Sequence, residues 1–355
     1  MSELRYDPIK QRWVIIASER KLRPREFAVP RQRSEDKHTA DGCPFGAGNE
    51  HLTPPEILVL PPPPGTNGGR RWQVRVVPNK FPALHVEGEV AREGVGLFDR
   101  VSGVGAHEVI IETPDHHREM ADLGAAELAV VFTAYRERLL DLRRDSRLRY
   151  ILIFKNAGRE AGASLYHPHS QLIATPIIPT FVVQELNAAQ RHYSRKERCV
   201  FCDLIRQEQL LGDRIGLETE HYVAVQPFAS AFPFETWILP KKHNYDLAQA
   251  NDDELHGLAV IVRDLLRRLR VLLDDPPYNM VVHTAPSPHP RPGQPSFWST
   301  IEYDFHWHLE IVPRITRIAG FEWGSGYTIN PTPPEEASRF LKEADPDGGG
   351  HGELP

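Results

Sequence analysis

Short apolar runs alternate along the chain with two long segments of helical period. Apolar residues recur at steps of three and four over residues 125–144 and 255–273, which predicts two amphipathic helices, each with one buried face. Shorter runs rich in valine, isoleucine and aromatic residues predict strands. These runs are 13–17, 74–77, 107–112, 150–154, 222–228, 236–243 and 278–283.

The predicted elements come twice in the same order. In each half, strands are followed by a long helix, by a further strand and by a pair of histidines, His167 and His169 in the first half and His306 and His308 in the second. Chance does not keep the order of so many elements, so the pattern indicates an internal duplication. We predict an α+β fold with two duplicated halves, each an antiparallel sheet packed with a long helix.

The duplication divides the chain of 355 residues into two halves, 1–190 and 191–343, and a tail, 344–355. A chain of this length with 40% hydrophobic residues can bury a substantial core. The tail contains a glycine run and is predicted to be disordered.

Charge and composition exclude some classes of function. The formal net charge of -6 argues against a general binder of nucleic acid or of membrane surfaces, because such proteins carry a basic excess. The start of the chain lacks an apolar signal core, and the sequence has no long apolar span. We therefore expect a cytoplasmic protein. Its three cysteines are too few for a disulfide framework, so metal ligation is their expected use.

His167 and His169 lie one residue apart in a run that we expect to be extended. Side chains at i and i+2 share one face of a strand, so both imidazoles, and Gln171 after them, are expected to face one cleft. Spacing alone leaves open the alternative that these are satisfied core histidines. The preceding segment, 155–164, carries glycines that can expose backbone N–H groups, as an anion-binding loop requires.

A candidate metal site lies in the second half. Cys199 and Cys202, with His243 and His306, supply two thiolates and two imidazoles, the ligand set of a structural tetrahedral zinc site. The alternative is a pair of unrelated buried thiols.

The matching positions of the first half are Cys43, Gly46, His116 and His167, so a glycine stands where the second thiolate would be. Three expected ligands remain. A fourth would come from Glu50 or from water, or the site binds no metal.

The zinc assignment leaves His169 free of metal. A neutral imidazole held through one nitrogen presents the lone pair of the other to a substrate, and the Gln171 amide can donate to a phosphoryl oxygen as charge develops. Together these residues suggest transfer at phosphorus through a phosphoramidate. Arg20 and Arg23 follow the first predicted strand; they would clamp phosphate oxygens or form only a solvated turn.

Several motifs together resemble those of the galactose-1-phosphate uridylyltransferase family, a branch of the histidine triad superfamily. The resemblance spans about residues 6–334 and implies histidine-triad-like halves. It implies a ping-pong reaction in which His169 attacks the α-phosphorus of a nucleotide sugar, releases a hexose 1-phosphate and passes the nucleotidyl group to another sugar phosphate. The motifs are the 156–164 loop, His167-Pro168-His169-x-Gln171, Asp7-Pro8 with Trp13, Arg20, Arg23-Pro24, Cys43-Pro44-Phe45, Pro114-Asp115-His116 and Gly320-Phe321-Glu322.

The resemblance also implies roles for single residues. Gln171 would steady the phosphoryl oxygens and Glu322 would bind hexose hydroxyls. The active sites would lie near the interface of a homodimer, and zinc is the expected cofactor. The residues implied to hold the nucleotide and its phosphates are Arg20, Arg23, Asn79, Asn156, Gly162 and Ser164.

The chain also departs from the pattern of the galactose branch. Gly46 replaces a common cysteine, and Thr328 stands where that branch has a glutamine. Ser170 and the intact Cys199/Cys202 pair resemble the plant branch of ADP-glucose phosphorylase. The expected substrates are UDP-glucose and galactose 1-phosphate, and the alternative is phosphorolysis or adenylyl transfer with ADP-glucose. A histidine triad hydrolase and a non-catalytic nucleotide sensor are two further classes.

Overall fold

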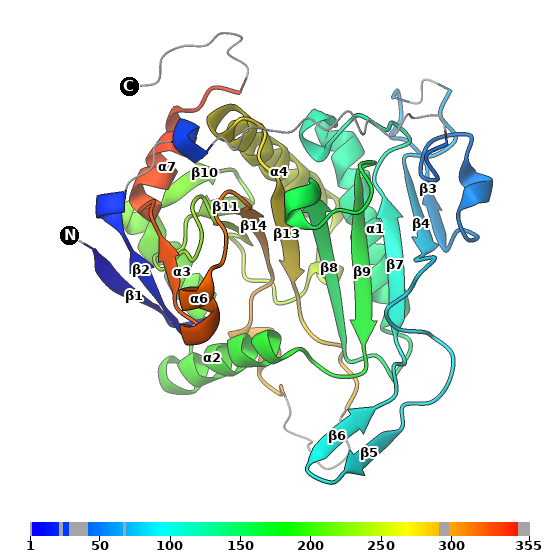
Figure 1. Ribbon diagram of the computed structural model, residues 1–355, viewed down its shortest axis with the longest axis horizontal. Coiled ribbons are helices and arrows are strands. Elements are labelled where there is room, and N and C mark those ends of the chain that lie inside the picture. Colours follow the sequence, from blue (N-terminus) through cyan, green and yellow to red (C-terminus); the bar gives the residue numbers. More distant parts are fainter. Residues whose placement is uncertain (1, 21–23, 28–41, 67–68, 291–297, 347–355) are drawn as a thin grey trace.

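The computed structural model describes residues 2–20, 24–27, 42–66, 69–290 and 298–346 (Figure 1). Its main element is an antiparallel sheet with five strands from each half. The strands are β3 (Leu58–Leu60), β4 (Val74–Pro78), β7 (Ala106–Ile111), β8 (Tyr150–Ala157), β9 (His169–Thr175), β10 (Ile215–Glu218), β11 (Tyr222–Val225), β12 (Thr236–Pro240), β13 (Tyr278–His283) and β14 (His308–Pro313). Their spatial order is β10-β11-β12-β14-β13-β8-β9-β7-β4-β3, so the two halves join where β13 pairs with β8.

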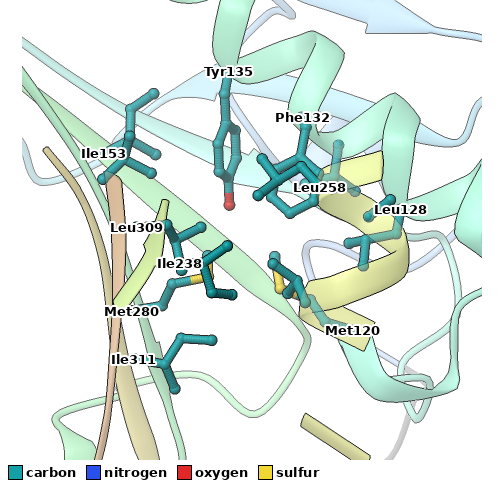
Figure 2. Close-up of a cluster of buried hydrophobic side chains, with 14 of the residues drawn as sticks. Met120, Leu128, Phe132, Tyr135, Ile153, Ile238, Leu258, Met280, Leu309 and Ile311 are labelled. Atoms are coloured by element: carbon teal, nitrogen blue, oxygen red, sulfur yellow. The ribbon is translucent and has the colours of Figure 1, made fainter. Parts of the chain in front are cut away.

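Two long helices, α1 (Ala125–Leu142) and α4 (Asp252–Leu273), pack on one face of this sheet. Figure 2 shows Phe132 of α1 and Leu258 of α4 pointing into a core that also contains Ile153, Met280 and Leu309 of the strands. All five side chains are almost inaccessible to solvent. Each contributes about 1.5–3 kcal/mol through burial, so this layer holds both halves together.

Helices α2 (Thr180–Lys196) and α3 (Val200–Leu211) cover the other face over the second half. Val182 and Phe201 pack there with Trp237 of β12. On the same face of the first half, the described residues include no such pair of helices; Phe45 and Trp72 pack there on Val109, beside the cavities described below. The remaining strands and α-helices are β1 (Glu3–Asp7), β2 (Arg12–Ile16), β5 (Arg92–Val95), β6 (Phe98–Val101), α5 (Ile301–Asp304), α6 (Gly320–Ser325), β15 (Thr328–Asn330) and α7 (Pro334–Glu343).

The structure confirms the α+β class, the antiparallel pairing and both long helices, with one refinement. The two sheets expected for the two halves form a single continuous sheet. The division at residue 190 stays a prediction, and β1 and β2 form a separate small sheet with β15 from the other end of the chain. Ala344 is packed in the core, whereas residues 347–355 of the predicted tail lie outside the described residues.

No helix in the described parts of the chain is both long enough and apolar enough to span a lipid bilayer.

The side chain of Glu127 caps the N-terminus of α1. Its carboxylate accepts the backbone N–H of Gly124 at 2.9 Å and a hydrogen bond from Arg118 at 2.7 Å, and Arg70 forms an ion pair with it at 3.1 Å. The bond from Arg118 is the main reason that the pKa of Glu127 falls to about 2. Because this pKa is lower in the folded than in the unfolded chain, ionised Glu127 stabilises the fold above about pH 4.5, and the gain is lost as pH falls towards 2.

We expect Glu127→Gln to lower the free energy of unfolding at pH 7 by about 1–2 kcal/mol, a value reduced for the solvent screening of Arg118. Urea titrations between pH 7 and pH 3 measure this difference, which should shrink below pH 4.5. Glu137→Gln is the control, because this half-buried glutamate of the same helix makes only a 3.4 Å ion pair with Arg136. A difference that stays constant down to pH 3 would contradict the electrostatic origin of the effect.

Candidate active site

Two cavities meet at His169 on the open face of the first half. One, of about 390 Å³, is lined mainly by the segment Lys155–Arg159 and by residues from Ala163 to His169. The other, of about 420 Å³, is lined by apolar side chains that include Phe45, Val77 and Phe81, and by Asn79 and Gln171. Ser164, Leu165 and His169 line both. The arrangement places a polar loop on one side of the histidine and an apolar pocket on the other.

The loop between β8 and β9 depends on two glycines with positive φ, Gly158 at 86° and Gly162 at 95°. A Cβ atom on Gly158 would lie 2.9 Å from Cβ of Pro277, so the close approach to the second half also requires glycine. Asn279 of β13 donates from Nδ2 to Oδ1 of Asn156 at 2.8 Å. With its oxygen occupied, the Asn156 side chain has its N–H groups available for a ligand.

His169 is the first residue of β9 and is oriented by its own backbone. Its Nδ1–H donates to the carbonyl oxygen of His167 at 2.7 Å, which leaves the lone pair on Nε2. Burial lowers the pKa of His169, so the imidazole is neutral at pH 7. Gln171 follows two residues later on the same face and lines the apolar cavity beside His169. The structure therefore brings together the two residues predicted to be catalytic.

Cys43, His116 and His167 form one of the groups that can hold a metal ion. Nδ1 of His167 lies 3.6 Å from Sγ of Cys43 and 3.3 Å from Nδ1 of His116. Nε2–H of His167 donates to the carbonyl of Thr113 at 2.8 Å, so Nδ1 is the free ligand atom, and burial lowers the pKa of this histidine to about 4. The fourth ligand considered, Glu50, accepts a hydrogen bond from Trp72 at 2.9 Å and is not a member of the group.

Cys199, Cys202, His243 and His306 form the second group, with all four ligand atoms within 4.8 Å of one another. The two imidazoles are held as in the first half. Nε2–H of His243 donates to the carbonyl of Glu302 at 2.9 Å, and that of His306 to the carbonyl of Pro240 at 2.8 Å, so both Nδ1 atoms face the thiols. This donor set and its hydrogen bonds to backbone carbonyls fit a tetrahedral metal ion.

A third group, Glu185, His283 and His308, did not stand out in the sequence. Oε2 of Glu185 lies 2.8 Å from Nδ1 of His283, and its Oε1 lies 3.2 Å from Nε2 of His308. Lys10 and Glu310 form an ion pair beside them. Three residues from three separate elements share no sequence spacing, so no motif could have indicated this cluster.

The same cluster gives the counterpart of His169 in the second half different surroundings. His308 occupies the matching position and donates in the same way to the carbonyl of His306, at 3.1 Å. Its Nε2, however, faces Glu185, and its side chain is fully buried under Trp237. His169 presents its Nε2 side to a cavity instead.

A buried polar network, also missed in the sequence, lies behind His169. Ser170 points to the helical side of the sheet, where Tyr135 lies 2.6 Å from its hydroxyl and Glu112 accepts a hydrogen bond from it. Nζ of Lys155 donates to Glu112 at 2.9 Å. Glu119 lies 3.7 Å from the same ammonium group and lines the polar cavity, and burial raises the pKa of this carboxyl.

Some predicted site residues lie elsewhere. Glu322 belongs to α6, which packs beside β15 at the far side of the second half, away from β9 (Figure 1). Arg20 ends a short 3₁₀ helix, Ser18–Arg20, but its side chain lies outside the described part, as does the whole of Arg23.

The duplicated α+β fold and the His-x-His-x-Gln strand beside a glycine loop fit the family that the sequence motifs resemble. Family models for galactose-1-phosphate uridyl transferase match both halves, the N-terminal domain over residues 1–179 and the C-terminal domain over 185–331. The chain belongs to the galactose-1-phosphate uridyl transferase family.

Its relatives include enzymes with two different names. The chain is 32% identical to an ADP-glucose phosphorylase of Arabidopsis thaliana over 96% of this chain and 92% of that protein. It is 29% identical to a galactose-1-phosphate uridylyltransferase of Thermotoga maritima over 97% and 99% of the two chains. The solved structure of the Arabidopsis ADP-glucose phosphorylase with bound ADP-glucose superposes with a TM-score of 0.78, at 29% identity over 97% of this chain and 99% of that one.

Proposed function

We propose that this protein is a hexose-1-phosphate nucleotidyltransferase that works through a covalent nucleotidyl-histidine at His169. In the first step, Nε2 of His169 attacks the α-phosphorus of a nucleotide sugar and hexose 1-phosphate leaves. In the second, a phosphate oxygen of the acceptor attacks the same phosphorus and releases the histidine. The observation that carries the proposal is the hydrogen bond that holds Nδ1 on the His167 carbonyl, with Nε2 beside two cavities.

The two cavities suit the two parts of such a substrate. The apolar pocket with Phe45, Val77 and Phe81 offers aromatic and aliphatic surface to a base. The glycine loop and Ser164 offer backbone and side-chain donors to the phosphates. Asn79, Asn156 and Gly162 would contribute as the family resemblance implies.

We infer that zinc is the metal of the Cys199, Cys202, His243 and His306 group, where four ligands close a structural site. Zinc bound there would supply stability rather than chemistry. Cys43, His116 and His167 offer three ligands, so we expect weaker binding in the first half. Metal in that site would fix His167, whose carbonyl orients the nucleophile.

The position of Glu322 supports a homodimer. Within one chain α6 lies away from β9 (Figure 1), so Glu322 would bind the hexose in the site of a partner subunit. The family resemblance implies active sites near a homodimer interface. Arg20 and Arg23 would contact the nucleotide phosphates.

The proposed substrates are UDP-glucose and galactose 1-phosphate. ADP-glucose with inorganic phosphate is the second candidate, favoured by Ser170 and by the similarity to the Arabidopsis ADP-glucose phosphorylase. Parallel assays with both pairs separate exchange from phosphorolysis. Release of free nucleotide to water would indicate a hydrolase, and binding without turnover a sensor.

The test of the Gln171 role is its replacement by alanine. We expect kcat to fall by about 10²–10³-fold, the loss of about 2.7–4 kcal/mol that follows removal of one donor to a developing oxyanion. The KM for the nucleotide sugar should change little, since the bond strengthens as charge develops. Steady-state kinetics with thermal melting as the folding control measures this, and an unchanged kcat would mean that the amide does not reach the phosphoryl group.

A further inference from the structure

His107 stands next to Gln171 but outside the lining of either cavity. It belongs to β7, and the antiparallel register pairs Val109 with Gln171, so His107 lies one diagonal step away on the same face of the sheet. It is half-buried, and its ring lies between the Gln171 side chain and the connection that follows β4.

The His107 imidazole makes three polar contacts. Nδ1 accepts the backbone N–H of Ala83 at 3.1 Å. Nε2 lies 2.9 Å from Oε1 of Gln171 and 3.1 Å from Nδ2 of Asn79. The Asn79 amide is itself oriented, because its Oδ1 accepts the backbone N–H of Phe81 at 2.9 Å.

These contacts determine the tautomer. A nitrogen that accepts a backbone N–H carries a lone pair, so the proton of the neutral ring is on Nε2. Asn79 Nδ2 is a donor and cannot accept that proton, so Oε1 of Gln171 is the acceptor. The backbone N–H of Ala83 thus keeps the proton of His107 on Nε2. As a result, His107 donates to Oε1 of Gln171 and not to its NH₂ group.

We propose that His107 is a positioning residue that fixes the orientation of the Gln171 amide. With Oε1 bonded to His107, the NH₂ group is the end left for the cavity and can donate to a phosphoryl oxygen. In the flipped orientation the amide would present its oxygen to a phosphoryl group, and the two acceptors would repel each other. The inference rests on the proposed function of Gln171.

The test is a double-mutant cycle. His107→Phe keeps a ring and removes both nitrogens, and we expect kcat to fall about tenfold, the scale of one net hydrogen bond, with KM for the nucleotide sugar within about twofold of wild type. In a Gln171→Ala background the same substitution should have no further effect on kcat. His107→Gln, whose amide N–H can donate to the same oxygen, should recover most of the loss. His85→Phe, an exposed histidine on the connection between β4 and β7, is the matched control.

Equal losses of kcat from His107→Phe in both backgrounds would overturn the proposal, because they would show a role independent of Gln171. Nitrogen-15 spectra of the histidines give a readout that needs no turnover. We expect His107 to carry its proton on Nε2, and we expect the Gln171 amide resonance to shift in His107→Phe. A proton on Nδ1 would overturn the inference. Absence of any nucleotidyl adduct in the wild-type protein would instead refute the proposed function, and the spectra would still decide the tautomer.

Discussion

Replacement of His169 by glycine is expected to abolish nucleotidyl transfer. The substitution removes Nε2, the proposed nucleophile, and loss of a nucleophile costs on the order of 10⁴–10⁶-fold in kcat. Intact-mass spectrometry after mixing with UDP-glucose or ADP-glucose should show a nucleotidyl adduct on the wild-type chain and none on His169→Gly.

Affinity for the nucleotide sugar separates loss of chemistry from loss of the fold. His169→Gly should still bind the nucleotide sugar, because both cavities keep most of their lining residues. His85→Gly, at an exposed position, is the control and should form the adduct normally. An adduct that persists in His169→Gly would place the nucleophile elsewhere.

Replacement of Cys199 by serine is expected to remove most of the bound zinc and to destabilise the fold. The group loses one of two thiolates, and binding of a structural metal contributes directly to folding. Cys199 is also buried in the core beside Phe201, so the loss extends into the second half. We expect the melting temperature to fall by roughly 4–7 °C, which corresponds to about 3–5 kcal/mol in a chain of this size.

Metal analysis with thermal melting decides this prediction. The wild-type protein should hold one tight zinc per chain, and Cys43→Ser, the matching change in the first half, should alter that number little. Full zinc content and stability in Cys199→Ser would refute the structural site. Two tight zinc ions per wild-type chain would show that Gly46 does not weaken the first site.

The repeated order of elements was enough to predict the duplicated α+β fold, since amphipathic period and apolar runs are local signals. The strand at 278–283 and the helix from Ala125 appear where the pattern predicted them. Helices α2 and α3 were not predicted. Their buried residues face a sheet that sequence alone does not assemble.

In the candidate site, too, some residues could be predicted from the sequence and others could not. Spacing identified the His167 and His169 pair and the cysteine groups, because residues of one motif stay close in any fold. Asn279, His107 and Glu185 could not be found, since each reaches its partner across strands or helices distant in sequence. Their roles depend on register, which no single motif contains.

The junction between β8 and β13 has a consequence for synthesis of the chain on the ribosome. The apolar strand at Tyr150–Ala157 has β9 on one side, and its other edge pairs with Tyr278–His283. Until that later segment emerges, β8 has an open edge that can pair with another nascent chain. Asn279 arrives with the same segment and is needed to orient Asn156. The first half thus contains His169 early, but the loop that precedes it, residues 156–164, is completed only after most of the second half has been made.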